Sequence, residues 1–237
     1  MLGNYLLLLL LLATAMWASV RAQKLTIAGA MVGGLIGFCI YQGAGFWGIG
    51  MIGLFFILGS LATSWKMNLK EKEGAAEKNK GRRKASQVLA NGGIAGLLGL
   101  LIWLFPEQTT VLRIMMAASL ASATADTLSS ELGTVYGSRF YNILTLKKDQ
   151  RGLDGVISAE GTLIGIAGSA LIALVYAWGF EWSESFWWII VAGTIGNLSD
   201  SILGAALERR HYLQNDAVNL LNTLIGALAA WLLYLVF

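Results

Sequence analysis

Long apolar segments separated by short polar stretches make up most of this chain of 237 residues. A helix that crosses a bilayer needs roughly 20 mainly apolar residues, so the pattern predicts an all-α, polytopic bundle of about eight spans in one domain, residues 1–237. The predicted spans are 3–20, 26–42, 45–64, 87–105, 112–132, 158–180, 186–207 and 217–237. The apolar run over residues 26–64 is about twice too long for one span, and we divide it at Gln42–Gly45.

The basic residues alternate with these spans. Sixteen of the 17 Lys and Arg residues lie in the loops after the first, third, fifth and seventh spans, and Arg113 lies on the other side. Since Lys and Arg concentrate in cytoplasmic loops, we expect the basic loop 65–86 and the second loop 134–157 to be cytoplasmic, with both termini outside. Within the first of these loops, we interpret the charged residues from Lys66 to Lys80 as a solvated segment.

The first apolar segment could also be a signal peptide, because a small residue precedes a potential cleavage point. However, no basic residues come before it, and Arg21 and Lys24 follow it. A signal peptide carries its positive charge ahead of the apolar stretch. We therefore expect a retained helix.

Composition supports a membrane protein and excludes several kinds of site. The chain is 56% hydrophobic and 13% charged, against about 25% charged residues in soluble domains. Because topology accounts for the basic residues, the net charge of +3 does not indicate a nucleic-acid partner. A single cysteine, Cys39, and a single histidine, His211, exclude an intrachain disulfide and a cysteine-based zinc site and argue against Ser–His–Asp or Cys–His catalysis. A bound metal would need oxygen ligands, which favours Mg²⁺ or Mn²⁺.

Carboxylates occur within two of the predicted spans. Asp126 and Glu131 lie in the segment SLASATADTLSSELG, and Asp200 lies in the seventh span. A carboxylate at membrane depth is costly and normally faces a protein interior, a cavity or a ligand. Polar packing between helices is the alternative interpretation, and Glu131 is close enough to the interface to be solvated. We expect Asp126 and Asp200 to be functional.

Polar residues also mark the cytoplasmic ends of other spans. Arg83, Gln87 and Asn91 recur every four residues, so they share a helix face; they could bind a phosphate or serve only as topological charge and N-terminal polarity. The glycine-rich, basic stretch before the sixth span suits an anion at a helix N-terminus. No GxxxxGK[ST] motif occurs, which argues against a P-loop nucleotide site.

Two segments repeat. The sequence GTLIG at residues 161–165 corresponds to NTLIG at residues 222–226, and Asp126-Thr corresponds to Asp200-Ser. The last four spans therefore form two copies of a helical hairpin in the same orientation. All the unusual polar residues fall in the cytoplasmic half, which argues against a path through the membrane.

These residues suit metal-dependent phosphate chemistry. One or two carboxylates plus substrate phosphates usually hold Mg²⁺, and phosphoryl transfer mainly requires positioning and charge neutralisation. A site that opens between apolar helices fits a lipid phosphate and a water-soluble nucleotide. The candidate catalytic residues are Asp126, Glu131 and Asp200, and the candidate metal ligands are Asp126, Asp200 and Asp216. The candidate substrate- and phosphate-binding residues are Arg82, Arg83, Gln87, Asn91, Lys147, Lys148, Arg151, Asp154, Ser158, Thr162, Asn197 and Asn219.

Five ordered motifs also resemble a known family. They are GRRKASQVLANGG, ATADTLSSELG, TLKK with RGLDGVISAEGTLIG, GNLSDSILGA and NDAVNLLNTLIGAL. They resemble the integral membrane family of human transmembrane protein 19, which also contains the plant phytyl-phosphate kinase of vitamin E biosynthesis. The resemblance implies a kinase that makes a prenyl diphosphate from a prenyl monophosphate and a nucleoside triphosphate, with CTP favoured. It points to Asn91, Asp126, Glu131, Asp154, Asp200, Asp216 and Asn219, while Lys84 departs from the acidic or Asn residue common at that position.

Two other functions stay open. A transporter or binding protein for lipid phosphates or small anions would suit repeated hairpins, although the one-sided polarity counts against it. A lipid-phosphate nucleotidyl- or alcohol-phosphotransferase is disfavoured, since Asp154-Gly155 is followed by Val, Ile, Ser and Ala instead of the pattern of CDP-alcohol transferases. The sequence also leaves a homodimer open.

Overall fold

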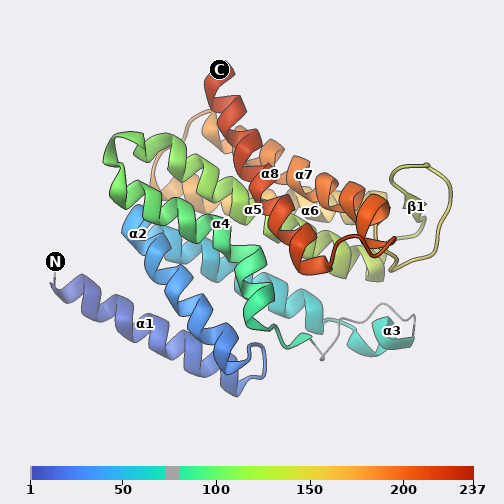
Figure 1. Cartoon of the computed structure of the whole chain (residues 1–237), viewed down its shortest axis with the longest axis horizontal. Coiled ribbons are helices and arrows are strands. Elements are labelled where there is room, and N and C mark those ends of the chain that lie inside the picture. The colour runs from blue at the N-terminus through green and yellow to red at the C-terminus, as the bar shows by residue number, and fades with distance from the viewer. Residues whose placement is uncertain (1, 73–80) are drawn as a thin grey trace.

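The computed structural model describes residues 2–72 and 81–237 and consists of packed helices (Figure 1). Seven helices in these ranges are long and apolar enough to cross a membrane. The long helices are α1 (Leu2–Arg21), α2 (Ile27–Ser64), α4 (Ala85–Leu104), α5 (Thr109–Tyr136), α6 (Ala159–Gly179), α7 (Ser185–Leu203) and α8 (Asn215–Val236). The short elements are α3 (Met67–Lys72), η2 (Pro106–Gln108), η3 (Gly204–Glu208) and an antiparallel pair, β1 (Tyr141–Asn142) and β2 (Val156–Ile157).

Helix α2 is two helical segments that fold back on each other. Its 38 residues would extend about 57 Å if straight, yet Lys24, just before its start, donates a hydrogen bond to Ser64 at its end (2.5 Å). The reversal occurs at Gly45, whose φ of 57° and ψ of −148° lie outside the helical region. The predicted division of residues 26–64 is therefore confirmed, and the described part of the chain contains eight apolar helical segments.

The connections between these segments alternate between two ends of the bundle. At one end, the chain before α2 pairs with the chain before α4, because Thr26 N–H donates to the Arg83 carbonyl and Arg83 N–H donates to the Lys24 carbonyl. At the opposite end, Arg113 Nε donates to the Gly43 carbonyl (2.8 Å) beside the reversal in α2. We call the first end the polar end; it holds residues 22–26, 65–72, 81–84, 137–158 and 209–214.

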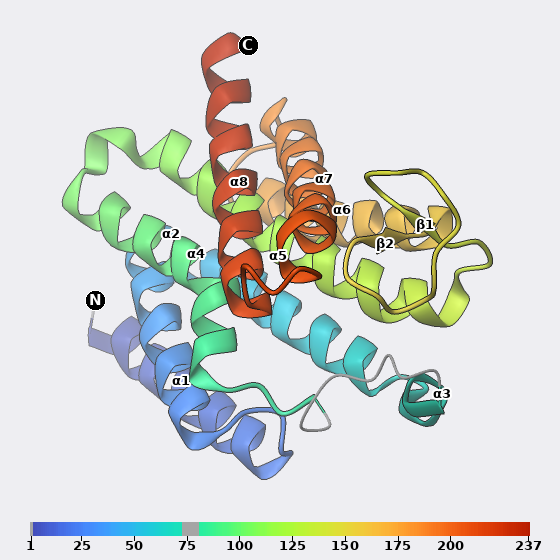
Figure 2. The ribbon, with the colours of Figure 1, turned by 45° about the vertical axis from the view of Figure 1, so that its right-hand side comes forward.

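Helix α5 runs through the middle of the bundle and contacts α2, α4, α6, α7 and α8 (Figure 2). Its central residues are mostly Ala and Ser and are almost completely buried, which lets neighbouring helices approach closely. A Cβ atom added to Gly165 of α6 would lie 3.1 Å from the Ala125 carbonyl, and one added to Gly226 of α8 would lie 2.8 Å from Ser122 Cβ. The two predicted hairpins, α5–α6 and α7–α8, thus meet along α5.

Candidate functional site

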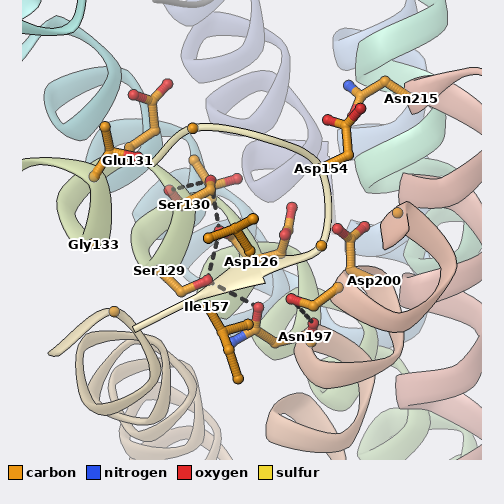
Figure 3. A pocket seen from close by; sticks show the side chains of 18 of the residues that line it. Asp126, Ser129, Ser130, Glu131, Gly133, Asp154, Ile157, Asn197, Asp200 and Asn215 are labelled. Carbon is orange, nitrogen blue, oxygen red and sulfur yellow. Dashed lines mark hydrogen bonds between the residues drawn. The ribbon is translucent and has the colours of Figure 1, made fainter. Parts of the chain in front are cut away.

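A polar cavity of about 580 Å³ lies at the polar end of the bundle. Helices α2, α4, α5, α6, α7 and α8 form its walls, and the chain over residues 152–157 crosses it (Figure 3). Eleven of the sequence-predicted site residues line this one cavity: Arg83, Gln87, Asn91, Asp126, Glu131, Asp154, Ser158, Thr162, Asn197, Asp200 and Asn219. Predicted residues from five helices, α4 to α8, and from the segments that precede α4 and α6 therefore converge here.

Asp126 and Asp200, which occupy equivalent positions in the two hairpins, lie together in this cavity. Their carboxyl groups lie within hydrogen-bonding range of each other, with Glu208 and Glu131 as further acidic neighbours of Asp126 and Asp154 as that of Asp200. Two carboxylates in contact repel each other unless a proton or a cation lies between them. This pair is therefore the part of the cavity best suited to bind a cation.

Ser129 and Asn197 form the adjacent wall. Ser129 Oγ donates to Asn197 Oδ1 (2.9 Å), and this bond joins α5 to α7 directly below the carboxylate pair (Figure 3). Asn197 is buried, and a Cβ atom on Gly165 would come within 2.7 Å of its amide nitrogen. The absence of a side chain at Gly165 thus makes room for Asn197 beside the cavity.

Arg83 enters the cavity from the segment before α4. Its backbone is held by the pairing with Lys24 and Thr26 described above. Its guanidinium group lies over the Phe55 ring, 5.4 Å from the centroid, and beside Gly59, where a Cβ would come within 2.7 Å of Nη2. Arg83 is 7% exposed. A buried guanidinium at a cavity wall is well suited to a phosphate, because it presents several donors in a fixed plane.

The two amides that follow Arg83 have partners on their own helix. Gln87 Oε1 accepts a hydrogen bond from Lys84 N–H (2.9 Å) and so caps α4. Asn91 Nδ2 donates to the Gln87 carbonyl (3.0 Å). Both residues still line the cavity, but part of their polarity stabilises the first turns of α4.

Helix α6 begins at the cavity because Ser158 caps it. Ser158 Oγ accepts from Gly161 N–H (3.1 Å), and Gly161 packs against Gly133 of α5 so closely that a Cβ on either would clash with the other's Cα region. The preceding chain is held down at Gly155, which has φ of 72° and lies directly against Ala205 of the π-helical turn η3. This packing brings Asp154 over the carboxylate pair.

Glu131 has a partner that the sequence did not reveal. Lys70 of α3 is completely buried, and its ammonium group donates to Glu131 Oε2 (2.5 Å) and to the carbonyls of Ala62 (2.9 Å) and Thr63 (3.0 Å). The interpretation of Lys66–Lys80 as a solvated segment is therefore wrong at Lys70, while residues 73–80 lie outside the described chain. The apolar residues Met67 and Leu69 within the charged run were the sequence signal that part of this segment packs against the bundle.

Five predicted residues are not among those lining the cavity: Arg82, Lys147, Lys148, Arg151 and Asp216. Arg82 Nε donates to the Leu25 carbonyl (3.3 Å), and Arg151 packs on the ring of Phe140, which does line the cavity. Lys147 and Lys148 are exposed in the loop that carries β1. Asp216 lies in the first turn of α8, beside the cavity-lining Asn215.

Most of the polar side chains that line the cavity carry oxygen atoms, which are the ligands that the hard cation Mg²⁺ prefers. Within residues 2–72 and 81–237, no cluster of three or more His, Cys, Asp and Glu side chains could hold a metal by itself. Mg²⁺ does not require such a cluster, since one or two carboxylates together with water and substrate phosphates usually suffice. Asp126 and Asp200 would supply the two carboxylates.

Comparisons with other proteins agree with the predicted family. Protein VTE6, chloroplastic, of Arabidopsis thaliana is 33% identical over 214 residues, which cover 87% of this chain and 63% of VTE6. Uncharacterised membrane proteins of Synechocystis and Methanocaldococcus jannaschii are 34% and 33% identical; the matches cover 83% and 90% of this chain and 77% and 87% of those proteins. No solved structure matches the chain. Residues 9–227 match one family over most of the chain, and the protein thus belongs to the integral membrane protein family DUF92, as its motifs predicted.

Proposed function

We propose that this protein is a membrane-embedded prenyl-phosphate kinase, which transfers a phosphoryl group from a nucleoside triphosphate to a polyprenyl or phytyl monophosphate. CTP is the favoured donor, as the family resemblance implies. The observation that carries the proposal is the contact between Asp126 and Asp200 in a polar cavity at one end of an apolar bundle.

The location of the cavity supports a lipid substrate. The polar residues lie at one end, while the rest of the bundle is filled by apolar side chains such as Ile40, Met51 and Ile172, all completely buried. A polar headgroup can enter the cavity from the interface while a hydrocarbon tail stays against apolar helices or lipid. We expect this end to face the cytoplasm, where nucleotides are available.

The residues of the cavity suit an in-line transfer between two phosphates. An oxygen of the prenyl monophosphate attacks the terminal phosphorus of the nucleotide, a new O–P bond forms, and the bond to the bridging oxygen breaks to release the nucleoside diphosphate. Arg83 neutralises phosphate charge, and Asn197 and Asn219 donate hydrogen bonds that orient the reacting groups. Ser129 orients Asn197 by donating to its amide oxygen. Asp126 and Asp200 would hold Mg²⁺, which would neutralise charge on the phosphate oxygens. The nucleophile is already ionised, so the reaction needs no general base.

Turnover by detergent-purified protein tests this proposal. The assay supplies radiolabelled CTP or ATP, Mg²⁺ and prenyl monophosphates of ten to twenty carbons, and measures lipid-extractable diphosphate. We expect labelled diphosphate that disappears with EDTA and in Asp126→Asn or Asp200→Asn, while Glu184→Gln at the opposite end keeps full activity. Binding of prenyl phosphate by well-folded protein without turnover for any donor would replace the kinase with a lipid-phosphate transporter or binding protein.

A further inference from the structure

Polar side chains from three helices form a continuous chain of hydrogen bonds that ends at Asp200. Ser122 Oγ of α5 donates to Asn222 Oδ1 of α8 (3.0 Å) and lies 3.1 Å from the Asn222 carbonyl. Asn222 Nδ2 then donates to Asp200 Oδ1 of α7 (2.8 Å). Ser122 and Asn222 are completely buried and lie beneath the cavity, whose lining they do not join.

The chemistry of these groups fixes the direction of the chain. Ser122 has acceptors on Asn222 at both the side-chain and the backbone oxygen, so its hydroxyl acts as the donor. The Asn222 amide must then turn its oxygen toward Ser122 and its N–H₂ toward Asp200. Because Asn222 is completely buried, leaving either end of its amide without a partner would be costly. Asp200 Oδ1 is therefore held in one position.

Close packing around Ser122 supports this arrangement. A Cβ atom at Gly196 of α7 would overlap Ser122 Oγ, and one at Gly226 of α8 would lie 2.8 Å from Ser122 Cβ. Two glycines thus bring α7 and α8 against the same hydroxyl group. The geometry that orients Asn222 is built into the crossing of the three helices.

The repeat shows that only one of the two carboxylates is held in this way. Asn222 of the second hairpin corresponds to Gly161 of the first, so no amide occupies the equivalent place. Gly161 instead packs on Gly133 and leaves space at the cavity. Asp126 and Asp200 are equivalent by position but differ in support: the Asn222 amide binds Asp200, whereas the repeat provides no such amide for Asp126.

We propose that Asn222 is a positioning residue that binds one oxygen of Asp200 and keeps the other available to a divalent cation shared with Asp126. The inference rests on the proposed metal-dependent function. Residues that hydrogen-bond to metal ligands typically change metal affinity or activity by 10–100-fold when they are replaced. Asn222 does this from beneath the cavity, without contact with substrate.

Manganese binding tests the role of Asn222 independently of activity. The full-length protein in detergent is titrated with Mn²⁺, and free Mn²⁺ is followed by electron paramagnetic resonance. We expect Asn222→Leu to raise the dissociation constant about 10–100-fold and Asp200→Asn to abolish the site. The matched control is Thr223→Val, the next residue on α8, which is also completely buried but bonds to the Ala90 (3.3 Å) and Leu220 (2.9 Å) carbonyls instead of a carboxylate.

Each outcome has a distinct meaning. Wild-type affinity in folded Asn222→Leu overturns the positioning role, and equal weakening in Thr223→Val reduces it to a general effect of packing. No Mn²⁺ binding by wild-type protein overturns the metal site and, with it, this inference.

If Asn222→Leu does not fold, Ser122→Ala decides, because it leaves Asn222 in place but removes the hydroxyl group that orients its amide. We expect a several-fold rise in the dissociation constant for Mn²⁺, and an unchanged value refutes the proposal. Turnover then adds a second readout: the Mg²⁺ concentration for half-maximal rate should rise while KM for the lipid is unchanged.

Discussion

The ammonium nitrogen of Lys70 lies 2.5 Å from Glu131 Oε2 and is completely shielded from solvent. Its two other hydrogen bonds go to the Ala62 and Thr63 carbonyls at the end of α2, where helices leave carbonyl groups unsatisfied. One side chain therefore closes the end of α2, pairs with a carboxylate at the cavity and attaches α3 to the bundle.

The first prediction concerns the stability that depends on this pair. Lys70→Met should lower the free energy of unfolding by about 3–5 kcal/mol, because it leaves Glu131 without its buried partner. Glu131→Gln in the same chain should recover part of that loss. Unfolding curves of the two single variants and the double variant measure the coupling. Lys66→Met is the control, since Lys66 is exposed and only lies near the Tyr136 ring (5.2 Å); simple additivity of the two single effects would contradict the pairing.

A second prediction separates function from stability at the carboxylate pair. Asp126→Asn should reduce turnover at least about 100-fold. Removal of one group that stabilises the transition state has an effect of this size in other enzymes. Its unfolding temperature should stay the same or rise, because the change removes one of two carboxylates in contact. Activity and thermal unfolding are measured on the same preparation. A large drop in unfolding temperature would instead assign Asp126 to the packing of α5.

Sequence reasoning predicted the helices and most of the cavity for a physical reason. Hydrophobicity and the cost of a charge at membrane depth are local properties, so the spans, Asp126 and Asp200 could be recognised one by one. The contact of Lys70 with Glu131 joins residues 61 positions apart, and no local pattern reports such a pair. The support of Asp200 by Asn222 depends similarly on the crossing of helices, although the repeat already showed that Asn222 replaces Gly161.

Gly45 provides a third prediction, for the reversal within α2. A Cβ atom there would contact nothing within 4 Å, so Gly45→Ala tests the backbone alone. Because φ is 57° and ψ is −148°, we expect a loss of about 1–3 kcal/mol in the free energy of unfolding. Gly53→Ala is the matched control: Gly53 also has open space but lies within the regular helix, where alanine should stabilise by about 0.5–1 kcal/mol. Stabilisation by both changes would mean that α2 does not reverse at Gly45.

The last prediction concerns the loop that crosses the cavity. Asp149 accepts a hydrogen bond from Arg209 Nη1 (2.7 Å), which ties this loop to the chain after η3. The hydrogen bond from Arg209, together with the N–H of Gln150, holds the pKa of Asp149 below its ordinary value. At neutral pH, Asp149→Asn should therefore loosen the loop and speed tryptic cleavage at the exposed Lys147 and Lys148.

The pH dependence of this tie follows from the sign of the shift. An unfolded Asp takes up its proton near pH 4, and the folded Asp149 takes it up at a lower pH. The stabilisation is therefore complete above the unfolded value and is lost as the pH falls through the folded value. The difference in unfolding temperature between wild type and Asp149→Asn should be constant from about pH 8 to pH 5 and shrink below about pH 4. The same substitution in an Arg209→Met background should have a smaller effect at every pH, because only the hydrogen bonds from Gln150 N–H and Asn142 then remain; an undiminished difference there would contradict the tie to Arg209.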